Sequence, residues 1–573
     1  MPRISRQNWI PSRRDPVVEN DLSVRLGLHP LAAAALAASG VTDPDEAAAY
    51  LSGSLADLPS PYHLRGMDDA VSIVLEAVAA QQPILVHGDF DADGICSTAV
   101  LVRALHRLGA KVHYFLPDRF RDDYGVSARA IKAAAGKGVE LLLTADCGIT
   151  AHKEVLLAKS LGCKVVVLDH HEPEASLPEA DALVAPRRPE WCYEWADMPA
   201  SALALKLVQA MAEALDDGVL VPEEFVDLAA IGVIADVAPM IGENRIIARA
   251  GLERMANTTN VGLRALMNVA SLTPPLRAYD VAFRLAPRLN AAGRLADATD
   301  ALDLLLTDGE EEARRLALYL DQKNRERQQI QEKVYREAAR MMAQRPDFLE
   351  LPVVVLSSPD WHAGVIGVVA SKMVEEFGRP AILFSEQEGH SRGSGRSIEG
   401  IDMVEALRRC DDFLGAYGGH AMAAGLRIDP LNLDAFRQGF ADVVSDMGIP
   451  AASTERPTAI PANLAEIDES LVADLARLEP FGPANPEPAF CLEAVEVVEV
   501  RTVGKDNQHL KLYLTDGGST VEAIGFRMGN GGRPQTGDII DLCFLPTVDE
   551  YWGRPQLQLR LEAWRPTKRP ARP

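Results

Sequence analysis

The chain has 573 residues, 47% of them hydrophobic, and a formal net charge of −24. This length exceeds what one hydrophobic core supports, so several domains are expected. The acidic surplus counts against a protein that coats nucleic acid with a basic surface, but it permits an enzyme with a local basic groove.

The cysteine and apolar patterns bear on the compartment. The seven cysteines include no Cys-x-x-Cys pair, which favours a reducing compartment over a disulfide framework or a zinc site. No apolar run approaches the ~20 residues that a bilayer-spanning helix needs. The N-terminus lacks the apolar core of a signal peptide. We therefore expect a cytoplasmic protein with no membrane partner.

Residues 1–65 are predicted to form a helical extension. Alanine-rich segments at residues 31–38 and 45–52 have helical character. We expect these helices to pack on the first α/β domain.

The first segment that carries chemistry is residues 87–98, which read His-Gly-Asp-Phe-Asp-Ala-Asp-Gly-Ile-Cys-Ser-Thr. Asp89, Asp91 and Asp93 alternate, so their side chains share one face of an extended segment. Carboxylates crowded in this way repel one another unless a hard cation such as Mg²⁺ or Mn²⁺ neutralises them. A solvated turn is the alternative. An EF-hand is disfavoured, because its twelfth position is Val100.

Other predicted strands also end in polar residues. Apolar runs at residues 141–144 and 164–168 end near Asp146 and His170. Residues 225–235 suit a helix or a fourth strand and end at Asp236. Helical stretches at 127–135 and 151–161 alternate with the strands, which predicts a parallel sheet that binds ligands at the carboxyl ends of its strands. We expect a metal site built from Asp91, Asp93, Asp146, His170 and Asp236.

A long helix is predicted next. Thr307-Asp-Gly-Glu310 has the pattern of a capping box, and no proline follows until Pro346. Such a helix reaches ~50 Å, and its polar middle suits a connector between two domains; a long surface helix is the alternative. A second α/β unit follows to about residue 448, and a linker follows that unit.

Beyond Pro486 the chain alternates like short strands, at residues 490–500, 509–514, 520–526, 539–545 and 556–561. Five such strands predict a small barrel, with an OB-fold preferred, and OB-folds commonly bind single strands. The candidate contacts are Arg501, Lys505, His509, Lys511, Phe526, Arg527, Tyr551 and Trp552. Phe526 is expected in the core.

These motifs resemble one family. Asp169-His170-His171, His87-Gly-Asp-Phe-Asp-Ala-Asp-Gly94, Thr144-Ala-Asp-Cys-Gly-Ile149 and Gly232-Val-Ile-Ala-Asp236 resemble the DHH phosphoesterases. Trp361-His-Ala-Gly-Val-Ile-Gly367, Gly393-Ser-Gly-Arg-Ser397 and Gly418-Gly-His-Ala-Met-Ala-Ala-Gly425 resemble the DHH-associated domain. With Ala286-Pro-Arg-Leu-Asn-Ala-Ala-Gly-Arg294 and the length, the chain is similar to the family's single-strand-specific 5′→3′ DNA exonucleases.

The resemblance implies the fold class α/β: a parallel-sheet DHH domain (residues 66–306), a connector helix (307–346), a smaller α/β DHH-associated domain (347–450) and an OB-fold barrel (451–573). It implies two Mn²⁺ or Mg²⁺ ions that support phosphodiester hydrolysis. The expected activity releases 5′-mononucleotides from single-stranded DNA with a 5′ end, in repair and recombination. A helicase and a single-strand-binding protein are implied partners.

The residue roles follow from the same resemblance. His87 joins the five expected metal ligands, and Asp146 is expected to bridge both ions. Asp89 is placed beside the ligands, and His171 is expected to act on a phosphate oxygen or to hold His170. The expected substrate contacts are Arg119, Arg288, Arg294, Ser394, Gly395, Arg396, Ser397, Gly419 and His420. Residues 393–397 would offer backbone N–H groups, hydroxyls and a guanidinium to a 5′-phosphate, with an ordinary turn as the alternative.

Two other functions stay open at this point. One is a DHH phosphodiesterase that acts on cyclic dinucleotides or short oligonucleotides; such relatives are shorter and lack the third domain. The other is a noncatalytic nucleic-acid-binding protein, which the complete acidic set disfavours.

Overall fold

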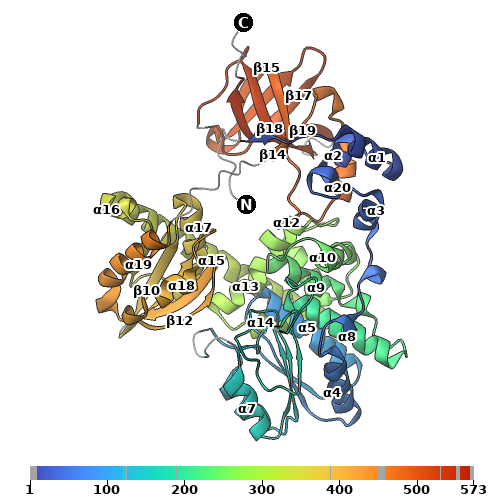
Figure 1. Ribbon diagram of the computed structural model, residues 1–573, viewed down its shortest axis with the longest axis vertical. Coiled ribbons are helices and arrows are strands. Elements are labelled where there is room, and N and C mark those ends of the chain that lie inside the picture. The colour runs from blue at the N-terminus through green and yellow to red at the C-terminus, as the bar shows by residue number, and fades with distance from the viewer. Residues whose placement is uncertain are drawn as a thin grey trace. The chain divides into compact units, whose positions relative to one another are not determined.

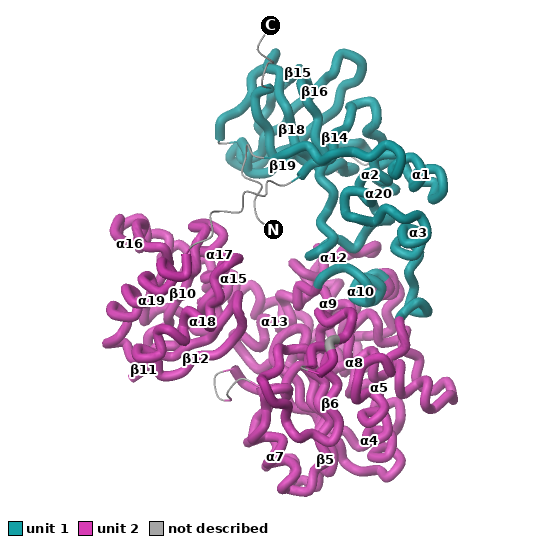
Figure 2. The backbone as a smooth tube through the Cα atoms, in the orientation of Figure 1, with its two compact units in different colours: residues 1–58, 239–249, 455–573 teal, residues 59–238, 250–454 magenta. Residues whose placement is uncertain are grey.

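The computed structural model describes residues 9–119, 122, 125–188, 190–387, 389–448, 458–529, 531–549 and 555–567. The chain forms two compact units (Figure 2). Unit 1 comprises residues 1–58, 239–249 and 455–573, and unit 2 comprises residues 59–238 and 250–454. Among the described helices, none has the length and apolar character needed to cross a membrane.

Unit 2 is built around a five-stranded parallel sheet, which Figure 1 draws in blue to teal. Its strand order is β3-β2-β4-β5-β6. Its strands are β2 (Ile84–His87), β3 (Val112–Phe115), β4 (Leu141–Ala145), β5 (Lys164–Leu168) and β6 (Ala182–Val184). The predicted parallel sheet is confirmed. The sequence pattern missed β3 and β6, the two edge strands, because β3 is only partly buried and β6 has three residues.

Helices alternate with these strands and continue after them. They are α4 (Met67–Ala79), α5 (Ala92–Arg107), α6 (Ala128–Ala135), α7 (His152–Ser160), α8 (Ala200–Leu215), α9 (Val226–Ala235), α10 (Gly242–Met255), α11 (Val261–Val269), α12 (Ala278–Asp280), α13 (Ala286–Leu295) and α14 (Thr299–Leu306). A π-helical turn, Val281–Leu285, joins α12 to α13. The sequence of residues 225–235 fits a helix or a strand, and the structure has the helix α9 at residues 226–235.

The long helix α15 (Glu310–Gln344) links this sheet to the second α/β part of unit 2. The predicted capping box is wrong: the helix begins after Gly309, and the Thr307 hydroxyl accepts a hydrogen bond from the Gly309 N–H at 3.2 Å. Three glutamates in the first turn stabilise the start of the helix instead, because their negative charges interact favourably with the positive end of the helix dipole.

The second α/β part is a mixed sheet in the order β12-β13-β11-β10-β9. Its strands are β9 (Val354–Ser358), β10 (Ala381–Gln387), β11 (His390–Arg396), β12 (Leu414–His420) and β13 (Ala423–Ile428). Its helices are α16 (Pro346–Glu350), α17 (Ala363–Phe377), α18 (Met403–Arg408) and α19 (Leu433–Met447). Trp361 is only 3% exposed and belongs to the core between α15, α17 and the sheet.

Unit 1 contains a closed barrel in which β15 (Phe490–Val503), β16 (His509–Thr515), β17 (Thr520–Gly525), β19 (Gln556–Pro566) and β18 (Ile539–Asp549) pair in that order. The ring closes because β15 also pairs with β18. β14 (Thr458–Pro461) adds to β15, and β1 (Ile10–Pro11) adds to β14. The predicted barrel is confirmed.

The N-terminal helices α1 (Pro16–Leu26), α2 (Pro30–Ala38) and α3 (Pro44–Ser52) form at the predicted places. Asp15 and Asp43 cap α1 and α3, and a proline follows each cap. Their predicted packing on the first α/β domain is wrong. Their apolar residues share one core with α20 (Glu469–Arg477) and the barrel, because β1 is paired to β14 and holds the segment in unit 1.

Phe526 also differs from expectation. It is 57% exposed and lies edge-on to His509, with ring centroids 5.3 Å apart. It follows the last residue of β17, so it lies in the turn rather than on the inner face of the strand. Tyr551 and Trp552 lie outside the described residues.

Candidate metal centre and phosphate site

The Asp-rich segment forms a tight turn between β2 and α5. Asp91 caps α5, and its carboxylate accepts hydrogen bonds from the Asp93 and Gly94 N–H groups, both at 3.1 Å. A Cβ at Gly94 would lie 2.7 Å from the Asp89 backbone, so glycine lets the turn close. This turn packs Asp89, Asp91 and Asp93 together.

Asp93 is fixed from a second side. Its two oxygens accept the Ala200 and Ser201 N–H groups at the start of α8, at 2.8 and 3.0 Å. The positive end of a helix stabilises a carboxylate placed there. A Cβ at Gly232 of α9 would lie 2.4 Å from Asp93 Oδ1, so glycine at this position allows α9 to approach Asp93.

The remaining acids come from β4 and α9. Asp146 follows β4 with φ of 66°, and its Oδ1 lies 3.0 Å from His170 Nε2. Asp236 is the C-cap of α9, with Oδ2 3.9 Å from His170 Nδ1. Asp236 therefore sits at a helix end rather than a strand end, but the predicted convergence with His170 is present.

The acids and imidazoles form overlapping groups in which the ligand atoms lie within 4.8 Å of one another. The groups are Asp93–His170–Asp236, Asp89–Asp91–Asp146 and Asp146–His170–His171. Asp146 and His170 each belong to two groups. The five residues expected to form a metal site therefore converge: Asp91, Asp93, Asp146, His170 and Asp236. Asp89, which is expected beside these residues, belongs to one of the groups.

The buried carboxylates of this cluster repel one another, and a bound cation would relieve that repulsion. Burial and the charges of neighbouring carboxylates raise the pKa of Asp89 to about 7 and the pKa of Asp93 to about 6. The same causes raise the pKa of Asp146 and of Asp236. Burial and then the His171 charge lower the pKa of His170 to about 3, which keeps its imidazole neutral as a ligand requires. Carboxylate oxygens with imidazole nitrogen suit Mn²⁺ or Mg²⁺.

Asp169 is a positioning residue that the sequence analysis did not assign. Its carboxylate accepts hydrogen bonds from His171 Nδ1 at 2.7 Å and from the Ile149 N–H at 2.9 Å. Burial would lower the pKa of His171, but the hydrogen bond and charge of Asp169 outweigh it and raise that pKa to about 9. The signal was available, because Asp169 also follows a buried strand.

His87 is engaged elsewhere in this structure. Its Nε2 accepts the Ser127 N–H and its Nδ1 contacts the Gly88 carbonyl oxygen, both at 3.0 Å. His87 is absent from the three groups described above. Burial lowers its pKa to about 4. Both ring nitrogens of His87 therefore have protein partners in this structure, and its expected role as a metal ligand stays a prediction.

Four guanidinium groups interact electrostatically, and two of them, Arg119 and Arg294, also interact with acids of the cluster. Burial and the charges of Arg119, Arg327 and Arg396 lower the pKa of Arg294 to about 9. The charge of Asp91 acts in the opposite direction on the pKa of Arg294, and the charge of Arg119 lowers the pKa of Asp89. Arg119 lies over the Phe90 ring at 4.2 Å. Such a group of cations favours a bound anion such as a phosphate. Arg327 of α15 was not predicted.

The 393–397 segment differs from the predicted phosphate loop. Most of it lies in β11, which pairs with β10 on one side and β13 on the other, so its backbone N–H groups are used by the sheet. Gly395 faces the core, where a Cβ would meet Met403 at 3.0 Å. Ser394 and Arg396 share the other face, with Arg396 Nη1 3.2 Å from Ser394 Oγ. Ser397 is buried and donates its hydroxyl to the Ile401 carbonyl oxygen.

Three other residues were expected to contact the substrate, and each has a different environment in the structure: Arg288, Gly419 and His420. Arg288 forms an ion pair with Asp321 of α15 at 2.8 Å. Gly419 has φ of 147°, and a Cβ there would lie 2.3 Å from the Ala423 oxygen, so the β12–β13 hairpin itself requires glycine. His420 stacks on His171 with ring centroids 5.6 Å apart, which brings it to the acid cluster.

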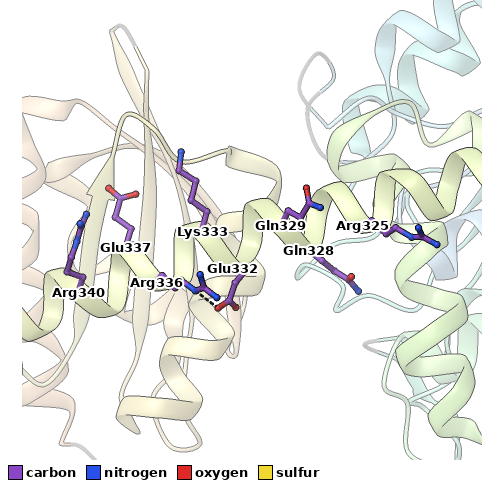
Figure 3. A pocket seen from close by; sticks show the side chains of 8 residues that line it. All are labelled: Arg325, Gln328, Gln329, Glu332, Lys333, Arg336, Glu337 and Arg340. Carbon is purple, nitrogen blue, oxygen red and sulfur yellow. Dashed lines mark hydrogen bonds and ion pairs between the residues drawn. The ribbon is translucent and has the colours of Figure 1, made fainter. Parts of the chain in front are cut away.

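A separate open hollow of about 770 Å³ lies along α15 (Figure 3). It is lined by Arg325, Gln328, Gln329, Glu332, Lys333, Arg336, Glu337 and Arg340. Its cations are partly neutralised, as Arg336 pairs with Glu332 at 2.8 Å. None of these residues belongs to the acid–histidine cluster, so the hollow is not the metal centre.

Comparisons with known proteins agree with this geometry. Sequence profiles match the DHH family N-terminal domain at residues 83–233, the DHHA1 domain at 350–446 and the RecJ OB domain at 459–563. The single-stranded-DNA-specific exonuclease RecJ of Escherichia coli is 34% identical over 93% of this chain and 96% of its own length. The Bacillus subtilis RecJ is 34% identical over 97% of this chain and 71% of its own.

Solved structures give the same answer. RecJ of Thermus thermophilus in complex with Mn²⁺ is 33% identical, with a TM-score of 0.83, and the match covers 98% of this chain and 80% of that one. An exonuclease RecJ bound to manganese matches 68% of this chain and 97% of its own, at 39% identity and a TM-score of 0.60. With its DHH, DHH-associated and OB domains in the matching order, the chain belongs to the RecJ family of DHH phosphoesterases.

Proposed function

We propose that this protein is a metal-dependent exonuclease specific for single-stranded DNA. The observation that carries the proposal is the buried acid–histidine cluster, whose acids interact with Arg119 and Arg294 of a four-arginine group, in a chain similar to RecJ over nearly its full length. The acids suit divalent cations and the arginines suit a phosphate, so one phosphodiester can be held against both.

The cofactor is Mn²⁺ or Mg²⁺. When bound, two such ions would supply charge stabilisation for the phosphate and would lower the pKa of bound water. We assign Asp91, Asp93, Asp146, His170 and Asp236 as ligands, add Asp89, and place Asp146 between the ions. α8 holds Asp93, and the turn before α5 holds Asp91, so the backbone fixes these ligands before an ion arrives.

His171 acts next to this cluster. Asp169 accepts a hydrogen bond from its Nδ1, which fixes the ring. The proposed role of the imidazolium is to donate from Nε2 to a nonbridging phosphate oxygen, as charge builds up there in the transition state. His420, stacked on His171, holds the ring from the other domain of unit 2.

The arginine group sets the polarity. Arg119, Arg294 and Arg396, with the Ser394 hydroxyl, are proposed to bind the 5′-terminal phosphate. A terminal phosphate carries more charge than an internal one, so the group selects a strand end. The enzyme then releases 5′-mononucleotides in the 5′→3′ direction, in repair and recombination. A helicase and a single-strand-binding protein are partners inferred only from the resemblance.

The barrel is proposed to hold the strand beyond the catalytic unit. Phe526 is exposed beside His509, and exposed aromatic rings on such barrels stack on bases. The RecJ OB profile match covers this part of the chain. A third domain favours a long strand as substrate over a cyclic dinucleotide.

The test is a Mn²⁺ titration with end-labelled single strands, the matching duplex and a cyclic dinucleotide. Ion-dependent mononucleotide release from the single strand alone supports the proposal. Cleavage of only the dinucleotide supports a phosphodiesterase, and binding without turnover supports a noncatalytic protein.

A further inference from the structure

The C-terminus of α9, next to Asp236, has an unusual residue in a strained position. Val237 has φ of 60° and is 66% exposed. A β-branched side chain in this left-handed region crowds the backbone, at a cost of roughly 1–2 kcal/mol. An exposed valine regains none of that cost through burial.

The hydrogen bonds identify the motif. The Val237 N–H donates to the Ile234 carbonyl at 3.3 Å, and the Ala238 N–H donates to the Val233 carbonyl at 3.4 Å. This is the Schellman ending of a helix, whose left-handed position is usually glycine. Val237 occupies that position.

The rest of the chain provides an internal comparison. The same pair of hydrogen bonds ends several other helices of the protein, with Gly40, Gly109, Gly138 or Gly162 in the left-handed position. Gln81 and Ser271 occupy it after α4 and α11. These two side chains are not β-branched. Among the described helix ends of this kind, Val237 is therefore the only β-branched residue in the left-handed position, and it adjoins Asp236 of the proposed metal centre.

We infer that Val237 contacts a nucleobase of the strand, next to the phosphate held at the metal centre. Strained residues persist where the surroundings or the function require their side chain. Val237 adjoins Asp236, and consecutive Cα atoms are about 3.8 Å apart, so Val237 borders the proposed metal centre. A base offers the apolar surface that the Val237 isopropyl group lacks in the protein alone. The inference rests on the proposed function.

The experiment compares Val237→Ala, Val237→Ile and Val237→Gly on 5′-phosphorylated single strands with Mn²⁺. We expect Val237→Ala and Val237→Gly to lower kcat/KM by roughly 10-fold, as expected when two methyl groups lose an apolar contact. Val237→Ile should keep the parental value. Val237→Gly should unfold at the parental temperature or above, because relief of strain offsets the added freedom of the unfolded chain.

A second substrate series shows whether the contact is with a base. A tetrahydrofuran abasic residue replaces the first or the second nucleoside from the 5′ end. At one of these positions the abasic strand should slow the parent and leave Val237→Ala unchanged, so that the 10-fold difference disappears. Gln81→Gly and Ser271→Gly, at the same motif elsewhere, should leave kcat/KM unchanged for every strand.

Three outcomes overturn the inference. The first is parental kcat/KM for Val237→Ala on intact strands. The second is a difference that persists at both abasic positions. The third is a weaker Mn²⁺ midpoint in Val237→Ala, which assigns Val237 to the placement of Asp236 instead. Failure of the proposed function is distinct, because the parent itself would then release no nucleotide.

Discussion

Asp146 has a central place in the proposed metal centre. It is 2% exposed, lies 3.0 Å from His170 Nε2 and belongs to two of the three ligand groups. Burial and the charges of Asp93, Asp91 and Asp89 raise its pKa well above the usual value. Without a cation, this carboxylate destabilises the folded protein at neutral pH.

Replacing Asp146 with asparagine should therefore separate stability from activity. We expect Asp146→Asn to lower cleavage by more than about 100-fold, the upper range for losing even an outer contact to a ligand. In EDTA the variant should unfold at a higher temperature than the parent, because asparagine carries no charge to repel its neighbours. Strand binding in EDTA should be nearly unchanged. Parental turnover would remove the bridging role.

The raised pKa values also predict how pH affects metal binding. The folded pKa of Asp89 is about 7 and that of Asp93 about 6, both above their unfolded values. The metal-free folded protein therefore retains protons that the unfolded chain releases, and it loses stability as pH rises through this range. Bound ions displace those protons. The rise in unfolding temperature on adding Mn²⁺ should be small at pH 5.5 and large at pH 8; an equal rise at both pH values would contradict this.

Arg396 tests the phosphate site. Its Nη1 donates to Ser394 Oγ, and no ion pair to a carboxylate is found for it among the described residues. Arg396→Ala should reduce the preference for a 5′-phosphoryl over a 5′-hydroxyl end by roughly 10-fold, since a charge-assisted hydrogen bond contributes about 1.5–3 kcal/mol. Arg408→Ala, which removes an exposed Glu405 partner on α18, is the control. An unchanged preference in Arg396→Ala would refute the role.

For single residues, the sequence predicted which side chains converge better than it predicted their hydrogen-bond partners. The motifs named the acids and His170 that converge. They did not show that backbone N–H groups of Phe90 and Ser127 hold Asp89 and His87, because backbone donors leave no trace in side-chain identity. Arg327 of α15 was missed for a different reason. It lies in a stretch whose polar residues predict a solvent-exposed helix.

Among the elements, α9 and α15 position the site in ways that periodicity does not reveal. The apolar run of α9 is buried on all sides, so its pattern fits a strand or a helix equally well. The contact of α9 with Asp93 through Gly232 decides the matter only in three dimensions. β11 shows the opposite error, since its glycines suggest a loop but lie in a sheet, where Phe384 and Met403 exclude larger side chains.

An ion pair between Arg288 and Asp321 links α13 to α15. Arg288 and Asp321 have side chains that are 15% and 6% exposed, and their atoms are 2.8 Å apart. Asp321→Ala leaves Arg288 partly buried without its carboxylate, which should cost about 2–4 kcal/mol. Urea unfolding of unit 2 should show this loss, whereas Glu312→Gln, at an exposed pair on the same helix, should show none. Equal stability of both variants would mean that the pair does not hold α13.

At the scale of the whole chain, the order of domains was predictable and the path between them was not. Residues 9–58 are separated from the barrel by the entire catalytic part in sequence, yet they share its core. Residues 239–249 also belong to unit 1, where Arg245 lies over the Tyr50 ring at 3.8 Å and donates to the Leu478 oxygen. Helical periodicity shows that a face is apolar, but it does not name the surface that covers it.

This shared core predicts which unit responds to a change in α1. Leu22 is fully buried against the barrel core, whereas Val24, on the same helix, is 74% exposed. Leu22→Asp buries a charge without a partner, a change that commonly costs several kcal/mol, and Val24→Asp does not. Hydrogen exchange should show lost protection in β15 to β19 for Leu22→Asp alone. β2, β4 and β5 should stay protected, and Mn²⁺ should still raise the unfolding temperature of unit 2. Loss of protection in β2 to β5 instead would mean that α1 is needed for the catalytic sheet, as the sequence had first indicated.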